Sequence, residues 1–119
     1  MASGRIISFG WTVEALLGGW KRCSRRCWKD AYAETFHADQ TCQAYDRSPR
    51  VGGRRVAWIR LTRDPYKEPL AMVTGEEERA EGGLWGSAEA FIEAFCAGAR
   101  VTREERLWVV RFDLIQVEL

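Results

Sequence analysis

Long hydrophobic runs are missing from this 119-residue sequence, and it contains only three prolines and one histidine. No apolar stretch approaches the roughly 18 residues that a membrane span needs. Residues 1–5 carry no long apolar run after their charge, so the sequence predicts neither a secretion signal nor a membrane partner. We therefore expect a soluble protein of the cytoplasm. The length fits a single domain, residues 1–119, with no room for a second one of ordinary size.

The four cysteines and the single histidine do not form a metal-binding pattern. Cys23 and Cys27 have three residues between them and His37 follows, but no second close ligand pair completes a tetrahedral zinc site. In a reducing cytoplasm the cysteines are expected to be thiols. The sequence therefore predicts no bound metal and no cofactor.

Acidic residues are scarce in the first half of the chain and basic residues are scarce in the second half, although the net charge is only +1. Residues 1–63 hold 12 Lys and Arg against 5 Asp and Glu, whereas residues 64–119 hold 6 against 12. The basic half suits a phosphate or a nucleic acid. The acidic half can add a carboxylate to the same site or form a solvated helical face.

Apolar periodicity predicts short strands that alternate with short helices. Strands are expected at 6–9, 42–45, 56–61 and 107–117, with a hairpin turn at 46–53 and an irregular link at 65–69. Helices are expected from Thr12 to Gly19 with Trp20 on the buried face, within 28–41, from Thr74 to Ala80, and from Ser87 to Gly98. This order favours an α+β fold with a small mixed sheet or barrel and two to four short helices.

The segment from Gly19 to Arg26 has the most distinctive chemistry. It places Lys21 three residues before Ser24 and adds Arg25 and Arg26 directly afterwards. Neighbouring cations disfavour a further positive charge, so we expect the arginines to lower the proton affinity of Lys21. A lysine without its proton can act as a general base toward a hydroxyl nucleophile. In an extended segment residues 21 and 24 would face opposite ways, so a joint site needs a turn or bulge.

This segment also carries a resemblance to a known family. Gly19, Lys21, Ser24 and Arg26 match a Gly-x-Lys-x-x-Ser/Thr-x-Arg pattern after a strand and a helix, and Ala80-Glu81-Gly82 ends a later helix. Together these features resemble the ASCH domain, over nearly the whole chain. The resemblance implies a single small PUA-like mixed β-barrel.

The family includes small bacterial amidohydrolases that act on N4-acetylcytidine. The resemblance places their Lys, Thr and Glu triad on Lys21, Ser24 and Glu81, with serine in place of threonine. It implies that Ser24 attacks the amide with Lys21 as its base, that Glu81 moves a proton to or from the exocyclic nitrogen, and that Arg26 steadies the oxyanion. The segment 28–53 departs from the family pattern, and it bears most on the identity of the substrate.

The expected partner is a modified nucleoside or RNA. Substrate binding is assigned to Arg25, Arg26, Tyr45, Asp46, Arg47 and Ser48. Two alternatives stay open at this point. The same basic pocket can bind RNA or a modified nucleotide without catalysis, with Tyr45 or a tryptophan stacking on a base. It can also cleave RNA, because a lysine base and arginines on the phosphate suit that reaction too.

Overall fold

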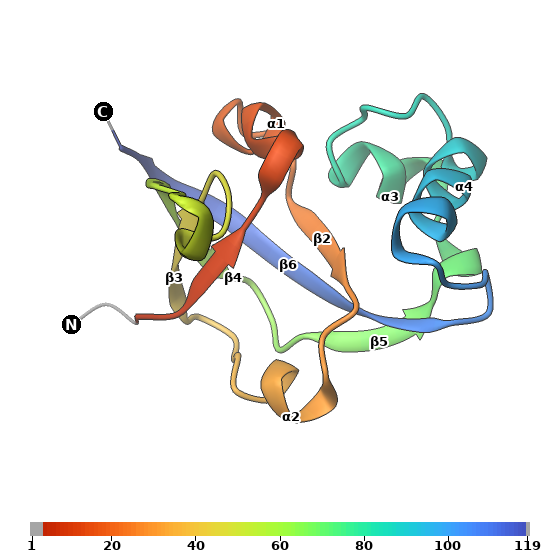
Figure 1. The fold of residues 1–119 in the computed structure, drawn as a ribbon, viewed down its shortest axis with the longest axis horizontal. Coiled ribbons are helices and arrows are strands. Elements are labelled where there is room, and N and C mark those ends of the chain that lie inside the picture. Colours follow the sequence, from red (N-terminus) through yellow and green to blue (C-terminus); the bar gives the residue numbers. More distant parts are fainter. Residues whose placement is uncertain (1–3, 119) are drawn as a thin grey trace.

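A strongly curved mixed sheet of six strands is the centre of the fold (Figure 1). The computed structural model describes residues 4–118. The strands are β1 (Ile6–Ser8), β2 (Cys23–Arg26), β3 (Thr41–Tyr45), β4 (Arg55–Leu61), β5 (Tyr66–Pro69) and β6 (Arg106–Val117). The strand order is β1-β3-β4-β6-β2, and β5 also pairs with β6. Only the β1–β3 pairing among these is parallel, so the sheet is mixed and curls into a half-barrel.

Strand β6 joins the two ends of the molecule because it pairs with three other strands. Its residues 112–117 pair with β4, while residues 106–111 lie between β2 and β5. Val110 and Phe112 are buried and Asp113 is exposed, which follows the predicted alternation of a half-buried strand. One continuous strand therefore holds β2 close to the helices that follow β5.

The helices are short, and side chains cap the last two of them, whereas the Thr12 hydroxyl donates to the Phe9 carbonyl and does not cap the first. They are α1 (Val13–Leu17), α2 (Asp30–Ala33), α3 (Gly75–Ala80) and α4 (Ala88–Ala99). The Thr74 hydroxyl accepts a hydrogen bond from the Glu77 amide at 3.2 Å, and the Ser87 hydroxyl accepts one from the Ala90 amide at 3.0 Å. Both bonds satisfy amides that the first turn leaves free, which confirms the two predicted helix starts.

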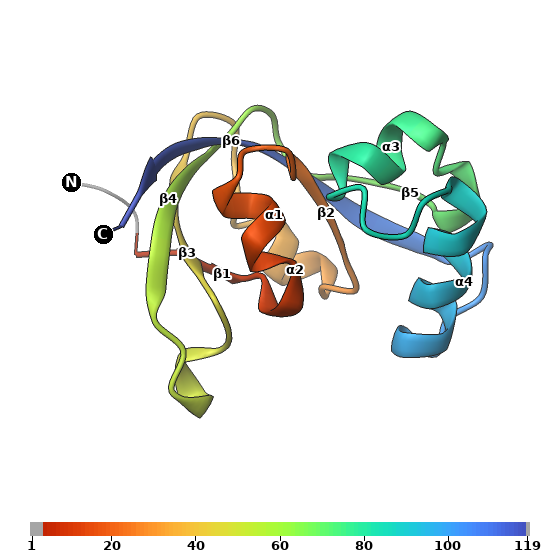
Figure 2. The same cartoon turned by 90° about the horizontal axis from the view of Figure 1, so that it is seen from above.

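The buried apolar residues form two clusters, and β6 contributes residues to both. The larger one fills the curve of the sheet under α1 and includes Leu16, Phe36 and Phe112. The smaller one includes Leu107 from β6 and Phe91 from α4. Figure 2 shows α3 and α4 at one end of the molecule and the β3–β4 hairpin at the other, with α1 between them.

The structure confirms the α+β class, the four expected helical regions and the four expected strands, and it corrects three details. Residues 66–69, expected as an irregular link, form β5 because β6 offers them a free edge. Residues 23–26 form β2. Trp20 lies beyond the end of α1 and is 54% exposed, because Gly18 and Gly19 end that helix before its next turn. In residues 4–118 no helix has the length and apolar character to cross a membrane. The expectation about a secretion signal concerns residues 1–5, of which 1–3 lie outside the described residues.

Candidate functional site

The turn between α1 and β2 brings Lys21 and Ser24 to one site. The Lys21 amide donates to the carbonyl of Ala15 at 3.1 Å, and the Arg22 amide donates to the carbonyl of Ala80 at 2.6 Å. These two bonds hold residues 21 and 22 outside the regular alternation of the strand that starts at Cys23. The lysine therefore lines the same cavity as Ser24, although the two are an odd number of positions apart.

Lys21 and Glu81 form a buried ion pair across 60 positions of sequence. The Lys21 Nζ donates to Glu81 Oε1 at 3.1 Å and to the Glu81 carbonyl at 2.8 Å. Glu81 caps the C-terminus of α3, and Gly82 follows with a φ of 134°, a conformation that favours glycine. Each side chain is nearly inaccessible to solvent, so the pair is shielded from bulk water.

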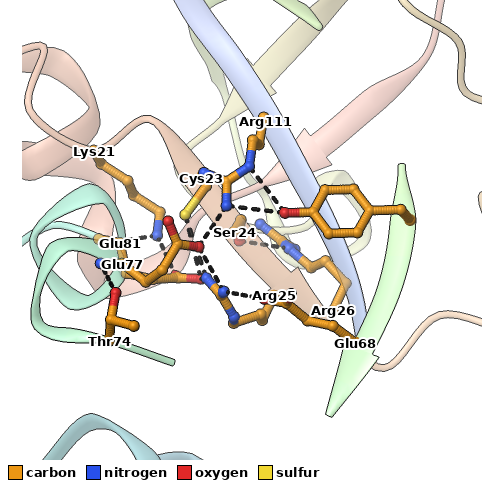
Figure 3. Close-up of polar contacts among 11 residues, drawn as sticks. Lys21, Cys23, Ser24, Arg25, Arg26, Glu68, Thr74, Glu77, Glu81 and Arg111 are labelled. Atoms are coloured by element: carbon orange, nitrogen blue, oxygen red, sulfur yellow. Dashed lines mark hydrogen bonds and ion pairs between the residues drawn. The ribbon is translucent and has the colours of Figure 1, made fainter. Parts of the chain in front are cut away.

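Arg25 occupies the centre of a larger charge network (Figure 3). Its Nη1 donates to Glu81 Oε2 at 3.0 Å, and its Nη2 donates to Glu77 at 2.7 Å and to Glu68 at 2.9 Å. Arg111 on β6 pairs with the same Glu77 carboxylate. Arg25 therefore fixes Glu81 so that the second carboxylate oxygen, Oε1, is left to face Lys21.

Burial and these carboxylates set the protonation of the network. Burial alone lowers the pKa of Arg25, but Glu81 and Glu77 outweigh it and raise that pKa above its usual value. Burial would raise the pKa of Glu77, yet hydrogen bonds from Arg25 and Arg111 bring it below the usual range. Burial, followed by the Glu81 charge, raises the pKa of the Cys23 thiol to about 12, so this thiol stays protonated.

Ser24 is held by its neighbour on the strand, Arg26. The Arg26 Nε donates to Ser24 Oγ at 2.9 Å, and Nη2 donates to the Ser8 carbonyl at 2.7 Å. The guanidinium also lies 5.3 Å from the centre of the Phe9 ring. Because the serine oxygen accepts from Arg26, its own hydroxyl proton is available to a base.

A pocket of about 230 Å³ that is open to solvent on one side collects these groups, and residues of both apolar clusters line it. We refer to it as the cavity. Lys21, Ser24 and Glu81 all line it, together with Arg25 and Arg26. Its remaining walls are aromatic and polar side chains of the N-terminal segment, the α3–α4 loop and α4: Ser8, Phe9, Trp11, Thr12, Trp85, Phe91 and Phe95. The structure therefore brings the three predicted catalytic residues and two predicted binding residues together.

The other four predicted binding residues lie elsewhere and do not line this cavity. Tyr45 ends β3, where its backbone pairs with Ser8. Asp46 accepts a hydrogen bond from the Arg54 amide at 2.8 Å, and Ser48 accepts one from the Arg50 amide at 3.2 Å. Arg47 is exposed on the same hairpin. In the described structure Asp46 and Ser48 thus satisfy the local backbone of a turn.

Sequence reasoning missed the residues that surround Arg25. The sequence predicts no place in the site for Glu68, Glu77, Cys23 or Arg111. The useful signal was the excess of acidic residues after position 64, which could have supplied partners for buried arginines. Within residues 4–118 no group of three or more His, Cys, Asp or Glu is placed to hold a metal ion.

Comparison with known proteins identifies a similar fold. No family model matches this chain. No curated protein matches it either. Among solved structures, the crystal structure of protein EF3133 from Enterococcus faecalis V583, described under the family model DUF984, is similar with a TM-score of 0.69. The match covers 98% of this chain and 79% of that one at 17% sequence identity. At this identity the likeness shows the fold alone, a small α+β domain with a curled mixed sheet.

Proposed function

We propose that this protein is an ASCH-like amidohydrolase that removes an acyl group from the exocyclic nitrogen of a modified cytidine. The observation that carries the proposal is the convergence of Lys21, Ser24 and Glu81 on one cavity. Lys21 and Glu81 are in direct contact there, at 3.1 Å. A nucleophile, a proton acceptor and a second acid–base group are what cleavage of an amide requires.

The ion pair can accept the serine proton without a neutral lysine at the start. As Ser24 Oγ forms a bond to the acyl carbon, its proton moves to Lys21 Nζ, and Lys21 passes one of its own protons to Glu81 Oε1. The carbonyl π electrons move onto oxygen, and Arg26, which lies beside Ser24 Oγ, stabilises this oxyanion. Lys21 remains an ammonium and Glu81 becomes a neutral acid.

The same pair then completes the reaction in reverse order. Glu81, through Lys21, returns the proton to the cytidine nitrogen as the carbon–nitrogen bond breaks, which leaves an acyl ester on Ser24. Water attacks the ester, its proton goes to the Lys21–Glu81 pair, and the Ser24 oxygen recovers a proton as it departs. The products are cytidine and a carboxylic acid, and the enzyme returns to its starting state.

The shape of the site supports a small substrate over a folded RNA. The cavity, at about 230 Å³, is smaller than the roughly 300–1,000 Å³ of typical ligand pockets. It therefore suits the acylated edge of one base. Arg25 is 4% exposed and has three carboxylate partners, so it is neutralised within the protein and leaves little charge for a phosphate.

Substitutions at Ser24 test the proposed nucleophile. Wild-type protein incubated with N4-acetylcytidine should release cytidine and acetate, measured by chromatography. Ser24→Thr should keep part of the activity because it keeps a hydroxyl, whereas Ser24→Ala should lower kcat by at least about 10³-fold. Thr102→Ala, which removes an exposed hydroxyl, is the matched control. Equal turnover by Ser24→Ala and wild type would assign the attack to water and remove Ser24 from the mechanism.

A second candidate function, RNA binding, is favoured by a different surface. Arg47, Arg50 and Arg54 are exposed on the β3–β4 hairpin. Figure 2 shows the tip of this hairpin projecting from the sheet, on the side of the molecule away from α4. Arginines on a projecting hairpin can contact phosphates without the cavity taking part.

The salt dependence of RNA affinity tests this surface. If the hairpin arginines contact phosphates, the affinity for a short single-stranded RNA should fall as salt rises, with a log–log slope of about −0.7 per phosphate contacted. The triple substitution Arg47→Gln, Arg50→Gln, Arg54→Gln should reduce that slope by about two, whereas Arg79→Gln with Arg100→Gln should leave it nearly unchanged. Binding that does not respond to salt would exclude this second function.

A further inference from the structure

An apolar groove that no step of the proposed reaction uses adjoins the reactive cavity. This groove has a volume of about 300 Å³ and lies between the N-terminal segment and α4. Four aromatic residues, Trp11, Trp85, Phe91 and Phe95, line both the cavity and the groove. The same four rings therefore border both spaces, and the groove lies next to the cavity that holds Ser24.

The walls of the groove are ordered aromatic rings. The ring centres of Trp11 and Trp85 are 5.3 Å apart, and those of Trp85 and Phe91 are 4.7 Å apart, both in edge-to-face contact. The buried Glu78 carboxylate accepts from the Trp85 amide at 3.0 Å and so fixes this part of the α3–α4 loop. Trp11 is nevertheless 69% exposed, an unusual state for so large an apolar side chain.

The floor of the groove is formed by small residues on α4. Ala94 and Gly98 are four residues apart, on one face of the helix, and Ala99 follows. A Cβ added to Gly98 would meet no atom within 4 Å, so the space above the helix is open. Among the described residues, none that carries a charge lines this groove. A nucleobase needs hydrogen-bond partners when it is buried, which this surface offers only at the two indoles.

We propose that the groove binds the acyl part of the substrate, and that the protein prefers acyl groups larger than acetyl. This inference rests on the proposed function and adds the substrate class. An aliphatic chain requires no polar partner and gains free energy from each methylene that it buries. The cytidine part then remains at the polar end of the cavity, beside Arg26 and Ser8.

A series of N4-acetyl-, N4-butyryl- and N4-hexanoylcytidine tests the inference. With the wild-type protein we expect kcat/KM to rise about threefold to fourfold per methylene, so that hexanoyl exceeds acetyl by on the order of 100-fold. The change should lie in KM, because the chain is bound equally in the ground and transition states. Gly98→Leu, which fills the groove, should reduce the hexanoyl-to-acetyl ratio by at least about tenfold.

Ala97→Leu is the matched control, because it adds a leucine at the neighbouring exposed position of α4, outside the groove. Its hexanoyl-to-acetyl ratio should equal that of the wild type. Turnover of all three substrates at similar kcat/KM, or equal ratios in Gly98→Leu and Ala97→Leu, would overturn the groove assignment and leave the proposed function intact.

If the wild type hydrolyses none of the three, the proposed function fails and calorimetric titration of the same compounds decides on the groove. Affinity that increases with chain length and is weakened by Gly98→Leu but not by Ala97→Leu retains the acyl site. Affinity that does not depend on chain length rejects it.

Discussion

Lys21→Ala is expected to abolish release of cytidine from N4-acetylcytidine, with a loss of at least about 10³-fold in kcat. The side chain contacts Glu81 through its Nζ and lines the same cavity as Ser24, so in the proposed mechanism it carries the proton between them. Without it the serine proton has no path to the carboxylate. The measurement is chromatographic assay of cytidine at saturating substrate, so that kcat is separated from KM.

Two further variants test whether the loss of activity is specific to the amine of Lys21. Lys21→Met keeps the length of the side chain and removes its charge, so it should be as inactive as Lys21→Ala. Lys29→Ala removes an exposed lysine outside the cavity and should keep wild-type turnover. Substantial activity in a folded Lys21→Met protein would show that the lysine only supports the structure and would end its assignment as the proton carrier.

Arg25→Met is expected to lower the free energy of unfolding by about 3–5 kcal/mol, because it leaves buried carboxylates without their cation. Glu81 would keep only Lys21, and Glu77 would keep Arg111. For a domain of this size the loss corresponds to a fall in Tm of about 10–20 °C. Urea unfolding followed by tryptophan fluorescence measures it.

An exposed ion pair supplies the control for this substitution. Arg103→Met removes a guanidinium that pairs with Glu89 on the surface, and such a change should cost less than about 1 kcal/mol. Similar losses in Arg25→Met and Arg103→Met would show that the buried network adds nothing beyond a surface pair.

Acid should reduce the difference in the free energy of unfolding between the wild type and Arg25→Met. The pKa of Glu77 in the folded protein lies below its ordinary value of 4.5, so its contribution to stability is complete above that pH. The contribution is lost as the pH falls through the lower, folded pKa, because the carboxylate is then protonated in both states. The difference in unfolding free energy between the two proteins should therefore shrink below about pH 4.5. A difference that stays constant down to pH 2.5 would show that the Glu77 carboxylate does not contribute to the stability that Arg25 provides.

Local features of the fold were predictable because neighbouring residues determine them. The Thr74 and Ser87 caps act within one turn, and the alternation around Phe112 follows from the two-residue period of a strand. Strand β5 was missed because Tyr66–Pro69 has no strand pattern of its own, and its ladder exists only because β6 lies beside it. Elements that depend on a partner strand cannot be found from their own residues alone.

The site, like the fold, has a part that the sequence predicts and a part that depends on the tertiary structure. Family resemblance in the sequence selected Lys21, Ser24 and Glu81, and the structure places all three on one cavity. The role of Arg25 was different, because a sequence shows only that an arginine follows a serine. Its direction, away from solvent and toward three carboxylates, depends on α3 lying beside β2 and on β5 lying on the other side of β6.

The sequence by itself therefore determined the composition of this protein's site: a lysine, a hydroxyl and a glutamate, with arginines beside them and no metal-binding pattern. The tertiary structure decided which charges are neutralised, which residues line the cavity, and that an aromatic groove adjoins it. The physical reason is the length of β6. One strand of 12 residues passes from one apolar cluster to the other, and residues of both clusters line the cavity.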